Sequence, residues 1–233
     1  SARKSSQPTG KTVIGGVSRH RCILSDLLVS MMFGVSAATS ISSLDDAFID
    51  VLSLGIARCR LPRSVERSIS IPKTAVFVAN WHEEDVLGAM VEGNLARIPI
   101  PEVSFFLGVY PNDVGTLRVA KELEAKYPDR VRVIVNTLPG PTSKGQMLNE
   151  MFSQAFSHED CPELAVLHDS EDVIDPRTFQ VYATYAPDHD FIQVPVFSLD
   201  RGKGAHVAST YMDEFAERHT REMIVRNAVG ATI

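Results

Sequence analysis

From residue 74 onward the sequence alternates short apolar runs, rich in β-branched residues, with longer amphipathic segments. The runs of strand length are 74–80, 103–110, 131–136, 163–169 and 191–199. Segments with helical spacing lie between them, at 83–98, 114–127, 143–156 and 177–186. Strands that alternate with helices of about 10–15 residues are typical of βαβ units. The sequence therefore predicts an α/β fold, with a mostly parallel sheet and helices on both of its faces.

Composition narrows the class of protein. With 233 residues, of which 44% are apolar and 22% charged, the chain has ordinary globular composition and the length of one α/β domain with an appendage. A net charge of −6 argues against a nucleic-acid partner, which normally requires a basic face. Cys22, Cys59 and Cys161 are widely spaced and follow no metal-ligand pattern. An odd cysteine count suits a reducing compartment, so the cytoplasm is the default location.

The N-terminal region is of a different kind. Its first residues are polar and do not read as a signal peptide. Leu27 to Leu44 is a run of 18 uncharged residues, close to the lower limit for crossing a bilayer. Its serines also fit an amphipathic or buried helix, so both interpretations stay open. The expected organisation is a polar tail at 1–22, a helical segment and candidate membrane or membrane-proximal helix at 23–60, a linker at 61–73 and the main domain at 74–233.

Polar clusters follow three of the expected strands. WHEED (81–85) follows the first, YPND (110–113) the second and DSED (169–172) the fourth. Ligands of open α/β sheets bind outside the carboxyl ends of the strands. We therefore expect the three clusters to form one site.

The DSED cluster carries the strongest indication of a ligand. Asp169, Glu171 and Asp172 crowd together where an apolar strand ends, and carboxylate oxygens are the ligands that Mn²⁺ or Mg²⁺ prefers. The nearby Asp175, followed by Pro176, instead resembles a helix N-cap with proline in the first turn. We predict a divalent metal site at the first three carboxylates and a structural role for Asp175.

The remaining clusters allow two interpretations each. WHEED contains Trp81 and Glu83 and would also serve as an acidic first helical turn. In the segment PGPTSKGQMLN, Lys144 stands at a helix start that could hold a phosphate, or it is simply exposed behind an N-cap at Ser143. The Walker loop, the dinucleotide-binding glycine pattern and the G-x-S-x-G elbow do not occur.

Taken in order, these segments resemble family 2 glycosyltransferases. VFVANWHEED, LGVYPND, SKGQMLN and HDSEDVIDP stand where that family has its donor-binding strands, its lysine loop and its D-x-D-type motif. The resemblance implies the GT-A (nucleotide-diphospho-sugar transferase) fold and inverting transfer of a sugar from a nucleotide-sugar donor to a glycan acceptor. It implies donor nucleotide binding by Trp81, Glu83, Asp113 and Lys144, and a divalent metal on Asp169, Glu171 and Asp172.

The same resemblance raises a question about activity. In the family, a later acidic motif supplies the general base and a Q-x-x-R-W-like motif closes the site, whereas this sequence ends at VRNAVGATI. We therefore expect a truncated transferase domain, to which no catalytic base is assigned. A catalytically incomplete, transferase-like membrane receptor or assembly protein is the alternative, and a nucleotidyltransferase is a weaker one.

The resemblance also extends upstream of the main domain. SSLDDAFIDV is similar to a stretch that follows a membrane helix in bacterial inner-membrane relatives. The expected location is the cytoplasmic face of that membrane, or the cytoplasm if Leu27 to Leu44 does not span.

Overall fold

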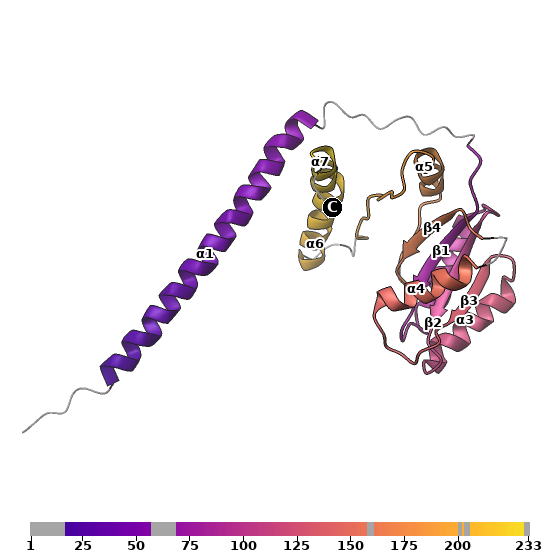
Figure 1. Cartoon of the computed structure of the whole chain (residues 1–233), viewed down its shortest axis with the longest axis horizontal. Helices are drawn as coiled ribbons and strands as arrows, with labels where there is room; N and C mark the ends of the chain where they lie inside the picture. Colours follow the sequence, from indigo (N-terminus) through magenta and orange to yellow (C-terminus); the bar gives the residue numbers. More distant parts are fainter. Residues whose placement is uncertain (1–16, 57–68, 158–160, 200–201, 203–205, 231–233) are drawn as a thin grey trace, which may run out of the picture. The chain divides into compact units, whose positions relative to one another are not determined.

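The computed structural model describes residues 17–56, 69–157, 161–199, 202 and 206–230 (Figure 1). The chain divides into two compact units, Arg63–Val194 on the one hand and Ser1–Pro62 with Pro195–Ile233 on the other. The first unit contains the predicted sheet. Each unit is described by itself below.

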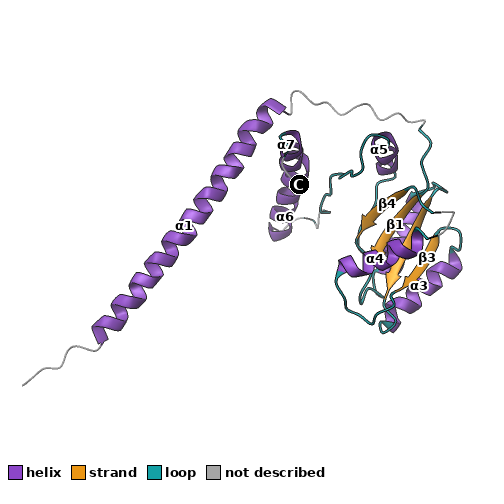
Figure 2. Ribbon diagram, in the orientation of Figure 1, coloured by secondary structure: helices purple, strands orange, loops and turns teal. Residues whose placement is uncertain are grey.

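The sheet of the first unit has four strands, all parallel. They are β1 (Thr74–Ala79), β2 (Val103–Val109), β3 (Val131–Val135) and β4 (Leu164–His168). Their order across the sheet is β3-β2-β1-β4, with β1 paired to both β2 and β4 (Figure 2). The predicted α/β class with a parallel sheet is confirmed. Since all four strands point the same way, their carboxyl ends meet at one edge.

Helices cover both faces of the sheet, as predicted. They are α2 (Leu87–Arg97), α3 (Val114–Lys126), α4 (Lys144–Ala155) and α5 (Arg177–Tyr185). Side chains of α2, α3 and α5 form one core with alternate residues of the strands, among them Val76 and Phe105. On the other face α4 packs over Phe77 and Phe106. A Cβ on Gly108 would lie 2.4 Å from the Met151 sulfur, so glycine is what allows α4 to approach β2 so closely.

The predicted fifth strand at 191–199 is wrong. This segment has no regular secondary structure, although its apolar residues suggested a strand. A strand requires a neighbour for its N–H and C=O groups, and within the described residues 191–199 pairs with none. Pro195 also lacks an N–H group to donate. Phe191 and Phe197 are consequently 76% and 58% exposed instead of buried in a core.

The second unit is helical. Helix α1 runs over 40 residues, Val17–Ile56, and α6 (His206–Glu217), the π-helical turn η1 (Arg218–Glu222) and α7 (Met223–Ala228) follow near the other end of the chain. Arg226 forms an ion pair with Asp45 at 2.7 Å, and Arg221 one with Asp50 at 2.8 Å. These ion pairs and the burial of Ile49 join α7 and η1 to the C-terminal third of α1.

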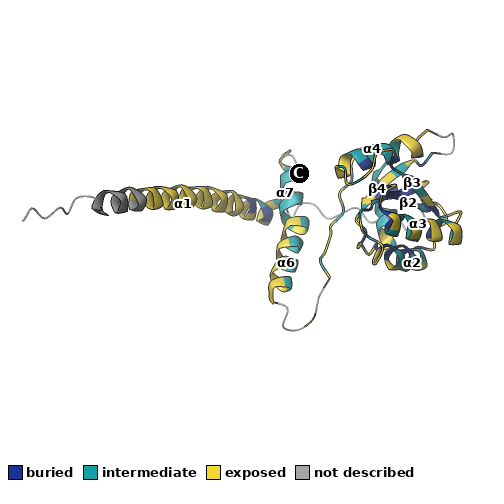
Figure 3. Cartoon of the chain, turned by 90° about the horizontal axis from the view of Figure 1, so that it is seen from below, coloured by how far each residue is buried: buried dark blue, intermediate teal, exposed yellow. Residues whose placement is uncertain are grey.

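Most residues of α1 from Asp26 onward are exposed (Figure 3), and many of them are apolar. Asp26–Ile56 is long and apolar enough to cross a membrane, judged by length and composition. The segment predicted to be helical from residue 23 is helical up to Ile56, and the helix begins earlier than expected, at Val17. Of the expected tail and linker, residues 1–16 and 57–68 lie outside the described part of the chain, and 69–73 have no regular structure.

Candidate functional site

A cavity of about 370 Å³ lies at the carboxyl edge of the sheet. Its wall includes Trp81 and Glu83 after β1, Lys144 at the start of α4, and Asp169 and Glu171 after β4. These residues come from three separate segments, and the parallel strand order brings the segments together. Five of the seven predicted site residues therefore line one cavity.

Aromatic rings form one side of the cavity. The Trp81 ring contacts that of Tyr110, which follows β2, with centroids 5.3 Å apart and the planes nearly perpendicular. A Cβ on Gly140 would lie 2.5 Å from the Trp81 ring and 2.6 Å from that of Tyr110. The loop before α4 therefore fits against both rings only because residue 140 is glycine.

Polar side chains after β2 fasten this loop. Asn112 donates to the Gly140 carbonyl at 2.8 Å and accepts from its N–H at 2.6 Å. The hydroxyls of Tyr110 and Thr142 are 2.7 Å apart. Ser143 accepts a hydrogen bond from the Gln146 N–H, which confirms the predicted N-cap at the start of α4. The position of Lys144, the first residue of the helix, is fixed by these contacts.

Charges of opposite sign meet on the other side of the cavity. The ammonium of Lys144 forms an ion pair with the Asp169 carboxylate. Both side chains are more than half exposed, at 54% and 57%. Glu171 is exposed as well. The oxygens of Asp169 and Glu171 are thus accessible to a ligand, and Asp169 already has a cation beside it.

Asp172 points elsewhere. One of its oxygens accepts from Nδ1 of His168 at 2.8 Å and from the Asp169 N–H at 3.0 Å. The hydrogen bond from His168 lowers the pKa of Asp172 and outweighs burial, which acts in the opposite direction. Asp172 does not line the cavity. Its carboxylate fixes the turn that carries the exposed acidic residues.

Asp113 also serves the backbone. It is 2% exposed and forms the N-cap of α3, accepting from the Thr116 N–H at 3.3 Å and from the His82 N–H at 2.7 Å. Burial alone would raise the pKa of Asp113, but these hydrogen bonds outweigh it and hold the pKa below its ordinary value. Asp113 is thus behind the wall of the cavity and holds the WHEED turn, where His82 has a φ of 58°.

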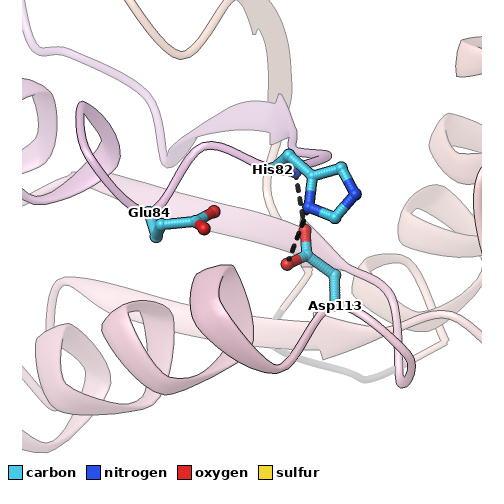
Figure 4. Close-up of side chains that lie close together, drawn as sticks. All are labelled: His82, Glu84 and Asp113. Atoms are coloured by element: carbon cyan, nitrogen blue, oxygen red, sulfur yellow. Dashed lines mark hydrogen bonds and ion pairs between the residues drawn. The ribbon is translucent and has the colours of Figure 1, made fainter.

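Within the described residues, His82, Glu84 and Asp113 are brought together as a possible metal-binding group, with ligand atoms within 4.8 Å of one another (Figure 4). Nδ1 of His82 also lies 3.6 Å from a carboxylate oxygen of Asp113. The Glu84 carboxylate lies near the first turn of α3, where Thr116 donates to it at 3.4 Å. All three residues are accounted for by the turn and the helix N-terminus they hold together.

Asp175 binds the start of α5, as the sequence predicted, but the N-cap position is Pro176, one residue later than expected. Helix α5 begins at Arg177, and the Asp175 carboxylate accepts from the Arg177 N–H at 2.9 Å and from its guanidinium. These hydrogen bonds lower the pKa of Asp175 to about 2.

Two residues that the sequence analysis overlooked are His168 and Asn94, whose amide contacts the DSED turn. Asn94 is a polar residue on the otherwise apolar face of α2, and this exception to the pattern could have drawn attention to it.

A parallel α/β sheet with an acidic cavity at its carboxyl edge agrees with the nucleotide-diphospho-sugar transferase class. Residues 72–233 match the model described as "Glycosyltransferase like family 2", and the chain belongs to that family. It is similar to bacteriophage adsorption protein B of Escherichia coli K12, with 34% identity over 208 residues. The bacteriophage N4 adsorption protein B of Escherichia coli O157:H7 matches to the same extent.

The alignment covers 83% of this chain and 28% of that relative, so the chain spans less than a third of the relative's length. Among solved structures, a mannosyltransferase from Pyrobaculum calidifontis, in complex with GDP-Man and Mn²⁺, is similar in fold. Its TM-score is 0.51 at 15% identity, with 73% of this chain and 48% of the other covered. The predicted GT-A fold and the family resemblance are both confirmed.

Proposed function

We propose that the chain binds a nucleotide sugar together with a divalent metal ion and forms the donor side of an inverting glycosyltransferase whose acceptor is a glycan. The observation that carries this proposal is the cavity in which Lys144 and the carboxylates of Asp169 and Glu171 lie together with Trp81. The family match supports the reaction class. The solved relative with GDP-Man and Mn²⁺ supports the choice of ligands.

The nucleoside half of the donor would occupy the side of the cavity formed by Trp81 and Glu83. The indole is partly exposed and offers a flat apolar surface to a base, and a carboxylate can accept hydrogen bonds from ribose hydroxyls. Asp113 contributes by holding the WHEED turn in place. Lys144 has the charge and the reach to bind a diphosphate oxygen at the start of α4, where free N–H groups favour anions.

Asp169 and Glu171 are the proposed metal ligands. Both expose hard oxygen donors at the same wall, and the position of the Lys144 ammonium beside Asp169 supports this assignment. A bound Mn²⁺ or Mg²⁺ supplies positive charge that offsets the charge developing on a departing nucleoside diphosphate. We assign Asp172 a supporting role, because one of its oxygens accepts from His168 and the Asp169 N–H and the residue does not line the cavity.

Inverting transfer requires one displacement at the anomeric carbon. The acceptor hydroxyl forms the new C–O bond while the bond to the diphosphate breaks with its electron pair, and a base takes the hydroxyl proton. Lys144 would stabilise the departing diphosphate oxygens electrostatically. We assign the general base to none of the described residues.

Helix α1 favours a membrane location for the protein. Leu27 to Leu44 would extend over about 27 Å, close to the roughly 30 Å hydrocarbon core of a bilayer. With the sheet unit in the cytoplasm, the cavity would face the compartment that supplies nucleotide sugars.

A receptor or assembly role is the second candidate, and the similarity to bacteriophage adsorption proteins favours it. In that case the acidic cavity would bind ligand without turnover. The two roles differ in one respect: Asp169→Ala would abolish transfer but leave a purely structural role in phage adsorption intact.

Calorimetric titration with UDP and with GDP, each with and without Mn²⁺, tests donor binding. We expect one nucleotide to bind only when Mn²⁺ is present. Radiolabelled nucleotide sugars incubated with membrane glycans then test transfer. Equal binding of both nucleotides with and without metal would contradict the proposed function.

A further inference from the structure

The turn that presents Asp169 and Glu171 is held from outside by one buried side chain. Asn94 of α2 is 1% exposed. Its amide nitrogen donates to the Asp172 carbonyl at 2.8 Å, and its amide oxygen accepts from the Ile174 N–H at 2.9 Å. Because one end meets a carbonyl and the other an N–H, the orientation of the amide is defined by its partners.

This pair of bonds replaces a strand neighbour. In a parallel sheet, a residue bonds the C=O of one residue and the N–H two residues later on the adjacent strand. The Asn94 amide does the same for the Asp172 carbonyl and the Ile174 N–H, which follow the end of β4. The Asn94 amide therefore makes the two hydrogen bonds that a neighbouring strand would make, although residues 172–174 lie beyond the end of β4.

The choice of asparagine has a cost that calls for a reason. Asparagine is a weaker helix former than leucine or methionine, and a polar group in a core is unfavourable without partners. Val91 and Leu87, one and two turns earlier on α2, are completely buried apolar residues. Both side-chain hydrogen bonds of Asn94 go to the turn, and Ile174, 3% exposed, anchors the same turn in the core.

A second set of bonds acts from within the turn. The Asp172 carboxylate joins His168 to the Asp169 N–H, and the Asp172 N–H donates to the Asp169 carbonyl at 3.2 Å. These bonds fix the backbone on one side of Glu171, while Asn94 fixes it on the other. The backbone that carries the Asp169 and Glu171 carboxylates is therefore restrained by hydrogen bonds on both sides of Glu171.

We propose that Asn94 is a positioning residue for the metal ligands: by holding the backbone at Asp172 and Ile174, it keeps the Asp169 and Glu171 carboxylates at the cavity. This inference rests on the proposed function. A residue that orients metal ligands typically contributes 10–100-fold in metal affinity. Asn94 itself touches neither metal nor donor.

The test compares Asn94→Leu with the parent chain and with Leu123→Ala. Leu123 is a buried residue of α3, so its truncation destabilises the same core without touching the turn. Mn²⁺ affinity is measured from the electron paramagnetic resonance signal of free Mn²⁺, with UDP or GDP present, and is expressed per folded molecule. We expect Asn94→Leu to weaken Mn²⁺ binding about 10–100-fold and Leu123→Ala to leave it unchanged.

Hydrogen exchange supplies the second readout. The Ile174 amide should exchange faster in Asn94→Leu, relative to sheet amides such as that of Val76. If Asn94→Leu does not fold, Asn94→Asp provides the same test, because it keeps the acceptor for Ile174 and loses the donor to Asp172. It should also bind Mn²⁺ more weakly.

The outcomes separate the two proposals. A parent chain that binds neither Mn²⁺ nor nucleotide overturns the proposed function, and the role of Asn94 with it. A parent chain that binds Mn²⁺ with the same affinity as its Asn94 variants overturns the role of Asn94 alone. An equal loss in Leu123→Ala would show that Asn94 acts only through general stability.

Discussion

The ammonium of Lys144 forms an ion pair with the carboxylate of Asp169, although 25 positions separate the two residues in the sequence. The contact joins the start of α4 to the end of β4, and so joins the proposed phosphate ligand to a proposed metal ligand. Both side chains are more than half exposed, at 54% and 57%. Ion pairs of this kind contribute only about 0–1 kcal/mol, so an incoming metal ion can displace the lysine.

Substituting Lys144 should have opposite effects on the two ligands. In Lys144→Met the competing ammonium is lost, so Mn²⁺ alone should bind up to about fivefold more tightly, the equivalent of about 1 kcal/mol. The nucleoside diphosphate should bind about tenfold more weakly, because a charge-assisted contact to the phosphate is lost. Calorimetry measures both. Lys121→Met, which removes a lysine paired with Glu124 on α3, is the control. Weaker binding of Mn²⁺ alone would contradict the displacement.

The acidic residues after β4 should divide into two groups by function. Asp169→Ala and Glu171→Ala should each weaken Mn²⁺-dependent nucleotide binding at least tenfold, since each removes an exposed oxygen ligand. Asp175→Ala should leave this affinity unchanged, because its carboxylate binds Arg177 at the start of α5. Calorimetry on the three variants, with circular dichroism to check folding, compares them. Equal losses at all three positions would refute the division.

The location of the site could be predicted from the sequence because it depends on topology. Apolar runs such as 74–80 and 163–169 gave parallel strands, and polar residues directly after parallel strands must meet at one edge. Trp81, Glu83 and Asp169 line the cavity for this reason. Each strand ends one residue earlier than predicted. A boundary error of this size leaves the following side chains at the same edge of the sheet.

The roles of individual carboxylates could not be predicted in this way. Asp113 and Asp172 lie in the expected clusters, yet Asp113 accepts from the N–H groups of His82 and Thr116, and Asp172 from His168 and the Asp169 N–H. Which way a carboxylate turns depends on partners such as the His82 N–H, which is 31 residues from Asp113 in the sequence. The predicted strand at 191–199 failed for a related reason, because a strand also requires a partner that its own sequence does not specify.

Gly140→Ala should damage the aromatic side of the cavity. The new methyl group would lie 2.5 Å from the Trp81 ring and 2.6 Å from that of Tyr110, so a ring or the loop must move. Overpacking of this kind typically costs about 1–3 kcal/mol, and displacing Trp81 should also weaken nucleotide binding. Urea unfolding and calorimetry measure the two effects. Gly93→Ala in α2 meets nothing within 4 Å and should stabilise the protein by up to about 1 kcal/mol without changing affinity.

Acid should destabilise the sheet unit partly through Asp113. Its pKa in the folded protein is lowered, so its contribution to stability is complete above the unfolded value of about 3.9 and is lost as the pH falls through the folded value. Asp113→Asn retains a good N-cap but loses the charge. It should be about 1 kcal/mol less stable than the parent at pH 7 and should lose less stability below about pH 4. Urea unfolding from pH 7 downward, followed by tryptophan fluorescence, measures both curves. Parallel curves would show that Asp113 does not carry the acid dependence.

Charges placed within the uncharged run of α1 should release the chain from membranes. Met32 and Val35 are 69% and 63% exposed, so no described segment of their own unit covers them. An arginine near the centre of a spanning helix costs about 2.5–3.5 kcal/mol on insertion scales, and two should prevent stable insertion. We expect the parent chain to stay in the membrane fraction after alkaline carbonate extraction, and the double variant Met32→Arg, Val35→Arg to appear in the supernatant. Phe191→Arg, which changes an apolar residue that is 76% exposed outside α1, should stay with the parent. A parent chain that carbonate releases would show that α1 does not span the bilayer.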